Sequence, residues 1–174
     1  MISDSNPGSD PAQWRLTSLQ RSDRDAVVSL IAAAMDEDEA RWAAQTLDFH
    51  FHCTEQGIDS MRRMYAARGA ERETLLGIVG LHQYRWGPEQ NVWLSWFAVH
   101  PNQQGQGIGK WMLASTQTQA RELGYRKMFI ETYRHPLFER ALEFYRRQGY
   151  REAGQVQGYL ADGSAMLILS KILS

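Results

Sequence analysis

Hydrophobic and polar residues follow one another along the chain in two kinds of pattern, which together predict a mixed α/β protein. Short alternating or wholly apolar runs are typical of strands, and they cover residues 14–19, 74–84, 91–99, 128–132, 151–157 and 165–172. Apolar residues spaced three or four positions apart are typical of helices, and they recur within residues 22–35, 39–49, 58–68, 108–123 and 138–148. Gly69, Gly124 and Gly149 follow three of these helices, at the position where glycine most readily ends a helix.

The order of these elements predicts a central sheet flanked by helices. Gly87-Pro88 separates strands 74–84 and 91–99, which we expect to be antiparallel neighbours. A helix connects strand 91–99 to strand 128–132, so this pair is expected to be parallel and joined by a right-handed crossover. Ser22 is expected to cap the first helix. Residues 14–174 are therefore predicted to form one domain, preceded by a polar tail of residues 1–13.

Composition and charge narrow the classes of function. Hydrophobic residues make up 43% of the chain and charged residues 22%, as in an ordinary globular protein. The formal net charge is −1 and no Lys/Arg run reaches three, so a nucleic-acid partner is not expected. No stretch approaches the roughly 18–20 apolar residues that span a bilayer, so no membrane association is expected. With Cys53 as the only cysteine and no signal-peptide core, the cytoplasm is the default location.

The stretch His50-Phe51-His52-Cys53 contains side chains that can bind zinc. No second Cys/His pair follows at a suitable spacing, and the other histidines are scattered along the chain. We therefore predict no metal site. The stretch is expected to end a helix, with Phe49 and Phe51 covering the core or a substrate cleft.

A glycine-rich turn between strand 91–99 and the next helix is the most informative segment. It reads Gln104-Gly105-Gln106-Gly107-Ile108-Gly109 and is followed by Lys110. Glycines let the backbone bring bare N–H groups close to a bulky anion, and the start of a helix adds unpaired amides with positive partial charge. The spacing matches neither the Walker A loop nor the dinucleotide-binding fingerprint. The turn thus predicts another kind of phosphate site, with a plain structural turn as the alternative.

Residues 91–150 resemble the GNAT family of N-acetyltransferases. Gln104, Gly107 and Gly109 fit the family signature Gln/Arg-x-x-Gly-x-Gly/Ala, after a strand that ends in Ala98-Val99-x-Pro101. Residues 141–150, which read ALEFYRRQGY, are close to the second family pattern A-x-x-[FL]-Y-x-x-x-G-[FY]. Two motifs in the right order and spacing are more specific than either one alone.

The resemblance implies the GNAT fold, an α/β (α+β) architecture whose mixed, mostly antiparallel sheet contains one parallel, splayed strand pair. It implies that the pantetheine arm of acetyl-CoA lies along Phe97, Ala98 and Val99. It implies that the pyrophosphate lies on the turn formed by Gln104, Gly105, Gln106, Gly107, Ile108, Gly109 and Lys110. A primary amine of a small molecule or peptide would then attack the thioester directly, with no metal ion. An amide near Val99 would stabilise the oxyanion.

Two side chains are candidates for the proton transfers of the reaction, one as acid and one as base. Tyr145 matches the family tyrosine that lies near the CoA sulfur, so it is the candidate general acid, with a core aromatic as the alternative. Glu131 is the best-placed carboxylate for a base, with an ordinary solvated glutamate as the alternative. Many family members place an asparagine seven residues before the tyrosine, where this chain has Phe138. An acyl-CoA-binding sensor or interaction module without turnover is therefore a second hypothesis.

The acceptor and the oligomeric state are left open by the sequence. Tyr84, Trp86, Trp93 and Tyr133 lie on elements that border the acceptor in GNAT proteins, so they are expected to line a pocket for an apolar or cationic amine or to pack in the core. GNAT proteins often pair through sheet edges, which makes a homodimer one expectation.

Overall fold

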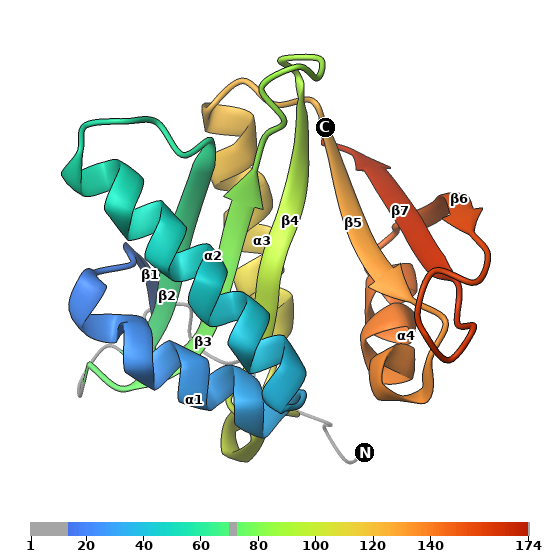
Figure 1. Ribbon diagram of the computed structural model, residues 1–174, viewed down its shortest axis with the longest axis horizontal. Coiled ribbons are helices and arrows are strands. Elements are labelled where there is room, and N and C mark those ends of the chain that lie inside the picture. The colour runs from blue at the N-terminus through green and yellow to red at the C-terminus, as the bar shows by residue number, and fades with distance from the viewer. Residues whose placement is uncertain (1–13, 70–72, 174) are drawn as a thin grey trace, which may run out of the picture.

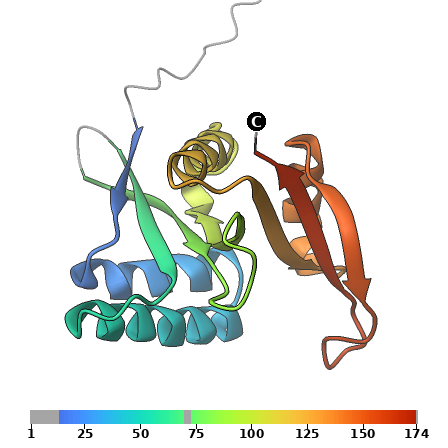
Figure 2. The ribbon, with the colours of Figure 1, turned by 90° about the horizontal axis from the view of Figure 1, so that it is seen from above.

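The computed structural model of the protein describes residues 14–69 and 73–173, which form one sheet with helices on both of its faces (Figures 1 and 2). The strands are β1 (Trp14–Ser18), β2 (Arg62–Gly69), β3 (Leu75–His82), β4 (Asn91–Val99), β5 (Lys127–Tyr133), β6 (Arg151–Val156) and β7 (Met166–Ile172). The helices are α1 (Arg24–Ala34), α2 (Glu37–Glu55), α3 (Ile108–Glu122) and α4 (Glu139–Arg147). Short 3₁₀ turns occupy Arg21–Asp23, Pro101–Gln103 and Pro136–Phe138.

The sheet has the strand order β1-β2-β3-β4-β5-β7-β6. All neighbouring strands are antiparallel except β4 and β5, which are parallel and connected through α3. The predicted α/β class, with a mostly antiparallel mixed sheet and one parallel pair, is confirmed.

Each face of the sheet has its own core. Helices α1 and α2 cover one face, where Ile31 and Leu47 pack with Ala66 and Ile78. Helices α3 and α4 lie on the opposite face (Figure 2). There, the fully buried Met112 and Leu113 of α3 belong to a cluster that also contains Leu81, Leu142 and Leu167. Alternate residues of a strand point to opposite faces, so each inner strand contributes to both cores.

The helix predicted over residues 58–68 is wrong, because this stretch contains strand β2. Ala66 of β2 is opposite Thr17 of β1 on one side and opposite Ile78 of β3 on the other. The apolar residues of the stretch fit a helical spacing locally, but pairing on both edges holds the backbone extended. Helix α2 is correspondingly longer than predicted, beginning after Asp36, whose side chain accepts a hydrogen bond from the Glu39 amide at 2.8 Å.

The first helix also begins later than predicted. Ser22 lies inside the 3₁₀ turn, and α1 starts at Arg24 after Asp23. The prediction that a glycine ends the helix is correct for α3 and α4. Gly124 (φ 90°) and Gly149 (φ 86°) directly follow the C-cap residues of these helices, and both glycines are left-handed.

A bulge in β4 lies next to the point where the sheet splits between β4 and β5. Ile78 of β3 is opposite Ala98 and Gly80 is opposite Ser95, so two residues of β4 face one residue of β3. Trp96, one of these two, has a φ of 42°. Such bulges bend a strand and increase its twist. Pairing between β4 and β5 accordingly covers only Asn91–Leu94 and Lys127–Ile130, and the two strands diverge beyond it (Figure 1).

None of the helices within the described residues is long and apolar enough to cross a membrane.

Candidate active site

A cavity of about 470 Å³ lies where β4 turns away from β5. One wall is the end of β4 and the turn into α3, and the opposite wall is α4. Eight of the residues predicted to hold acetyl-CoA line it: Phe97, Ala98, Val99, Gln104, Gly105, Gly107, Gly109 and Lys110. The other two do not line it. The Ile108 side chain is buried in the core, and Gln106 is exposed.

The turn into α3 presents unpaired amides to this cavity. Gly107 is the N-cap residue of α3 and has a φ of 88°, a conformation that a residue with a Cβ rarely adopts. The first intrahelical hydrogen bond runs from the Trp111 amide to the Gly107 carbonyl at 3.0 Å. The three amides of residues 108–110 therefore have no acceptor within the helix, and the positive end of the helix dipole lies among them.

Helix α4 adds two arginines that the sequence did not assign to the site. Arg140 and Arg147 both line the cavity opposite the turn. Arg147 also pairs with Glu143, one helical turn earlier, at 3.0 Å. Two guanidinium groups, the lysine Lys110 and a helix N-terminus make this cavity suited to a large polyanion.

A second cavity, of about 290 Å³, lies on the sheet face that carries α1 and α2. A row of directly opposed residues crosses the sheet here, from Arg62 of β2 through His82 and Trp93 to Phe129 of β5. The first three of these residues line the cavity, and Trp93 stacks on Phe129 with ring centroids 5.0 Å apart. The cavity thus has an aromatic floor with charged groups around it.

Three of the four aromatics predicted to border an acceptor line this second cavity. They are Tyr84, Trp93 and Tyr133. Trp86 does not, because it lies in the loop between β3 and β4 and is 86% exposed.

The two cavities share five lining residues: Met35, Phe97, Phe138, Ala141 and Tyr145. Tyr145 is the polar one among them, and its ring lies 5.9 Å from that of Phe97 between centroids. Within residues 14–69 and 73–173, the Tyr145 hydroxyl makes no hydrogen bond. Burial raises the pKa of Tyr145 well above its usual value, so the hydroxyl stays protonated at neutral pH.

Two carboxylates from different elements face the second cavity. Glu131 of β5, the predicted base, accepts a hydrogen bond from the Tyr133 hydroxyl at 3.1 Å. Glu39 of α2 was not predicted. Burial, followed by the charges of Asp36, Asp38 and Glu131, raises its pKa to about 7. Sequence pattern gives no signal for Glu39, because its position depends on how α2 crosses the sheet.

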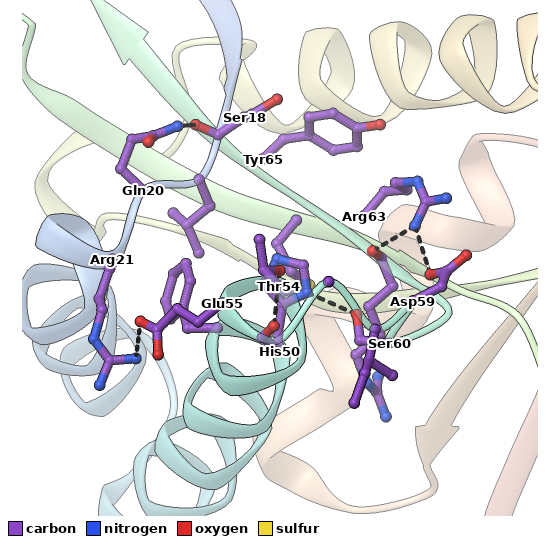
Figure 3. Close-up of a pocket in the computed structure, with 16 residues that line it drawn as sticks. Ser18, Gln20, Arg21, His50, Thr54, Glu55, Asp59, Ser60, Arg63 and Tyr65 are labelled. Atoms are coloured by element: carbon purple, nitrogen blue, oxygen red, sulfur yellow. Dashed lines mark hydrogen bonds and ion pairs between the residues drawn. The ribbon is translucent and has the colours of Figure 1, made fainter.

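A third and larger cavity, of about 690 Å³, lies at the other end of the α1/α2 face (Figure 3). Four of its charged groups form two ion pairs, Arg21 with Glu55 at 3.2 Å and Arg63 with Asp59 at 3.1 Å, and Arg62 lines both this cavity and the second one. None of the predicted cofactor residues lines it. It is therefore not part of the site between β4 and β5.

The His50–Cys53 stretch lies in the last turns of α2, as predicted. Phe51 and Cys53 are buried, whereas Phe49 is 55% exposed and covers no core. His50 contacts Ser60 at 2.9 Å (Figure 3). No group of three or more His, Cys, Asp or Glu residues in the described part of the chain is arranged to hold a metal ion.

A split parallel strand pair, with an anion-binding turn on one side and an aromatic cavity on the other, is the architecture of an acyltransferase. The sequence profile of the acetyltransferase (GNAT) family matches residues 26–150, and the chain belongs to this family. Its members use acetyl-CoA as the acyl donor.

Solved structures of similar fold come from several acetyltransferases. A protein from Desulfovibrio desulfuricans assigned to the GNAT family is 21% identical, with a TM-score of 0.79 over 92% of this chain and 98% of that chain. The spermidine/spermine N-acetyltransferase SpeG from Vibrio cholerae is 16% identical, with a TM-score of 0.71 over 94% and 95% of the two chains. An aminoglycoside 6′-N-acetyltransferase complexed with coenzyme A is 15% identical, with a TM-score of 0.69 over 92% and 97%. Among curated proteins, no sequence matches.

Proposed function

We propose that this protein transfers the acetyl group of acetyl-CoA to the primary amine of a small molecule or peptide, by direct attack within a ternary complex. The observation that carries the proposal is the position of Tyr145, whose side chain lines both the anion-binding cavity and the aromatic cavity. A donor in the first cavity and an acceptor in the second would meet beside its hydroxyl.

The donor fits the first cavity by charge and by backbone pairing. Its pyrophosphate would accept hydrogen bonds from the amides at the start of α3, supported by Lys110, Arg140 and Arg147. Its pantetheine amides would pair with the part of β4 from Phe97 to Val99, which β5 leaves unpaired. The acetyl group would then lie near Phe97 and Tyr145.

The chemistry requires proton transfers at the amine and at the leaving sulfur. A neutral amine attacks the thioester carbonyl, and the resulting oxyanion is stabilised by a β4 amide near Val99. As the C–S bond breaks, the departing thiolate takes the proton of Tyr145, and the nitrogen of the new amide loses its extra proton, which returns to the tyrosinate directly or through water. An alkylammonium with a pKa near 10.4 is only about 0.04% neutral at pH 7, so a base must remove a proton from the acceptor.

We assign the base role to the carboxylates of the acceptor cavity, Glu131 and Glu39. A pKa of about 7 leaves Glu39 half ionised at neutral pH, which suits a group that accepts and then releases a proton. Burial and the charges of Asp36 and Asp38 raise the pKa of Glu39, and the negative charge of Glu131 across the cavity raises it further.

The test is to incubate the purified protein with acetyl-CoA and a panel of amines while free thiol is measured. Amine-dependent thiol release, together with an acetyl-CoA-dependent rise in Tm, is the expected result. A rise in Tm without thiol release for any amine would favour the acyl-CoA sensor instead. Absence of both would refute the proposal.

A further inference from the structure

Among the described residues, Arg62 is unusual because a buried donor of its guanidinium has no partner. Its Nε atom is buried, yet it makes no hydrogen bond. Within residues 14–69 and 73–173, no carboxylate forms an ion pair with it. Leaving this donor unpaired is costly, because the Nε–H loses its hydration without replacement while the rest of the half-buried side chain stays partly accessible. Such a group is expected to have a partner that the isolated chain does not supply.

Neighbouring acids are engaged elsewhere. Asp59, on the adjacent cavity, accepts a hydrogen bond from Arg63 at 3.1 Å (Figure 3) and another from the Met61 amide at 2.8 Å. The histidine opposite Arg62 on β3, His82, does not compensate either. Burial and the Arg62 charge lower the pKa of His82 to about 4, so it is neutral at pH 7. Burial likewise lowers the pKa of Arg62 itself.

The acceptor cavity therefore has two poles of opposite charge. Arg62 on β2 forms the positive pole, and Glu39 and Glu131 form the negative one; all three line the cavity. Tyr84 lines the same cavity, and its pKa is raised by burial and by the charge of Glu131 and lowered by that of Arg62. The negative pole lies nearer than Arg62 to the point where β4 and β5 diverge, because Glu131 directly follows Ile130, the last β5 residue that pairs with β4.

We propose that the acceptor is an amine that also carries an anionic group, such as an amino acid or an aminophosphonate, and that Arg62 binds this group. The inference rests on the proposed acetyl transfer and names the substrate class for that site. The ammonium would lie at the Glu39 and Glu131 pole, next to Tyr145 and the thioester. The carboxylate or phosphonate would pair with the guanidinium, whose planar donors match such oxyanions in a bidentate manner.

The same arrangement discriminates against polyamines. A second cationic group would meet Arg62 in a partly dehydrated cavity, where like charges repel strongly. Arg62 is thus expected to be a residue that determines specificity rather than one that takes part in the chemistry.

The test uses acceptors in matched pairs: L-methionine with L-methioninamide, and β-alanine with β-alaninamide, with aminomethylphosphonate and spermidine as further probes. Each acceptor is compared between wild type and Arg62→Gln, so that differences in amine pKa cancel. We expect Arg62→Gln to lower kcat/KM for the acid-bearing amines by about 10- to 100-fold and to leave the amides within about twofold. Arg62→Lys should retain part of the activity.

Arg63→Gln is the matched control, because Arg63 is the next residue on β2 and does not line the acceptor cavity. It should leave all acceptors unchanged. The KM for acetyl-CoA should be unchanged in every variant, which also shows that each variant is folded. Turnover of polyamines or neutral amines in preference to the acid-bearing amines would overturn this inference while leaving acetyl transfer intact. Absence of turnover with every amine would instead refute the proposed function.

Discussion

The side-chain amide of Gln104 donates a hydrogen bond to the main-chain carbonyl of Val99 at 3.1 Å. This bond ties the start of the glycine-rich turn to the end of β4, the two segments that form one wall of the donor cavity. The glutamine of the family signature therefore acts on backbone position, which explains why a side chain with a donor is needed there.

Replacing Gln104 should loosen this wall. For Gln104→Leu we expect the KM for acetyl-CoA to rise about 3- to 10-fold, the effect of one ordinary hydrogen bond, with kcat little changed. Steady-state kinetics with acetyl-CoA as the varied substrate measure this. The control is Gln155→Leu, an exposed glutamine on β6, which should leave KM unaltered. An unchanged KM in Gln104→Leu would show that the bond does not shape the donor site.

Gly107→Ala should weaken acetyl-CoA binding at least tenfold. The φ of 88° at Gly107 strains any residue with a Cβ by roughly 1–2 kcal/mol, and the added methyl group lies in the turn that faces the phosphates. Gly124→Ala provides the matched control, because Gly124 has a φ of 90° at the opposite end of α3 and its Cβ would meet no atom within 4 Å.

Both glycine variants should lose similar thermal stability. Only Gly107→Ala should lose the acetyl-CoA-dependent rise in Tm. Equal ligand responses in the two variants would contradict a phosphate role for the turn.

Tyr145→Phe should keep acetyl-CoA affinity and lower kcat about 100-fold, because the thiolate then leaves without a positioned proton donor. Tyr150→Phe is the comparison, since Tyr150 is also a buried tyrosine and its ring lies 6.0 Å from that of Tyr145. Its hydroxyl accepts from Gln117 at 3.1 Å rather than lining the cavities, so its loss should reduce stability by about 1 kcal/mol and spare kcat. If the two variants have equal kcat, Tyr145 is not the acid.

Glu39→Gln should change the pH dependence of both activity and stability. The pKa of Glu39 is raised from 4.5 to about 7, so the folded protein binds more protons than the unfolded chain between these values. This contribution favours folding at low pH and is lost as the pH rises through about 7. The variant should therefore match wild type near pH 4. Near pH 8 its Tm should be higher by roughly 2–4 °C, which corresponds to about 1 kcal/mol after discounting for partial exposure.

For activity, the rise of kcat/KM through about pH 7 should be lost in Glu39→Gln, with a fall of about 10- to 100-fold at neutral pH. Glu37→Gln, an exposed acid in the same helical turn, should retain the wild-type profile. A wild-type profile in Glu39→Gln would leave Glu131 as the remaining candidate base.

The part of the site built from contiguous sequence was predictable. The turn from Gln104 to Lys110 and the helix bearing Tyr145 each form from neighbouring residues, and glycine spacing with helical periodicity is sufficient to place them. The residues that form the walls of the donor cavity were therefore largely predictable, and their role in holding acetyl-CoA stays a prediction. The positive charge that α4 contributes to this cavity was not predictable from the sequence. The pattern does not distinguish Arg140 and Arg147 from solvated helix residues.

The acceptor side was poorly predictable for a physical reason. Arg62 was assigned to a helix, because the stretch that contains it fits a helical spacing until pairing with β1 and β3 is considered. Glu39 reaches the cavity only through the crossing of α2 over the sheet. Contacts between distant segments decide both positions, and local pattern does not encode them.

The bulge at Trp96 also leaves half of β4 as a strand edge in the middle of the sheet. Unpaired edges tend to recruit strands from other molecules, which is a route to aggregation. Here the edge lies between the two halves of the sheet, where a second chain has poor access but a slender pantetheine arm can enter. The split therefore opens a strand edge to the donor without offering it to other chains, so protein stored without coenzyme A should stay as soluble as protein stored with it.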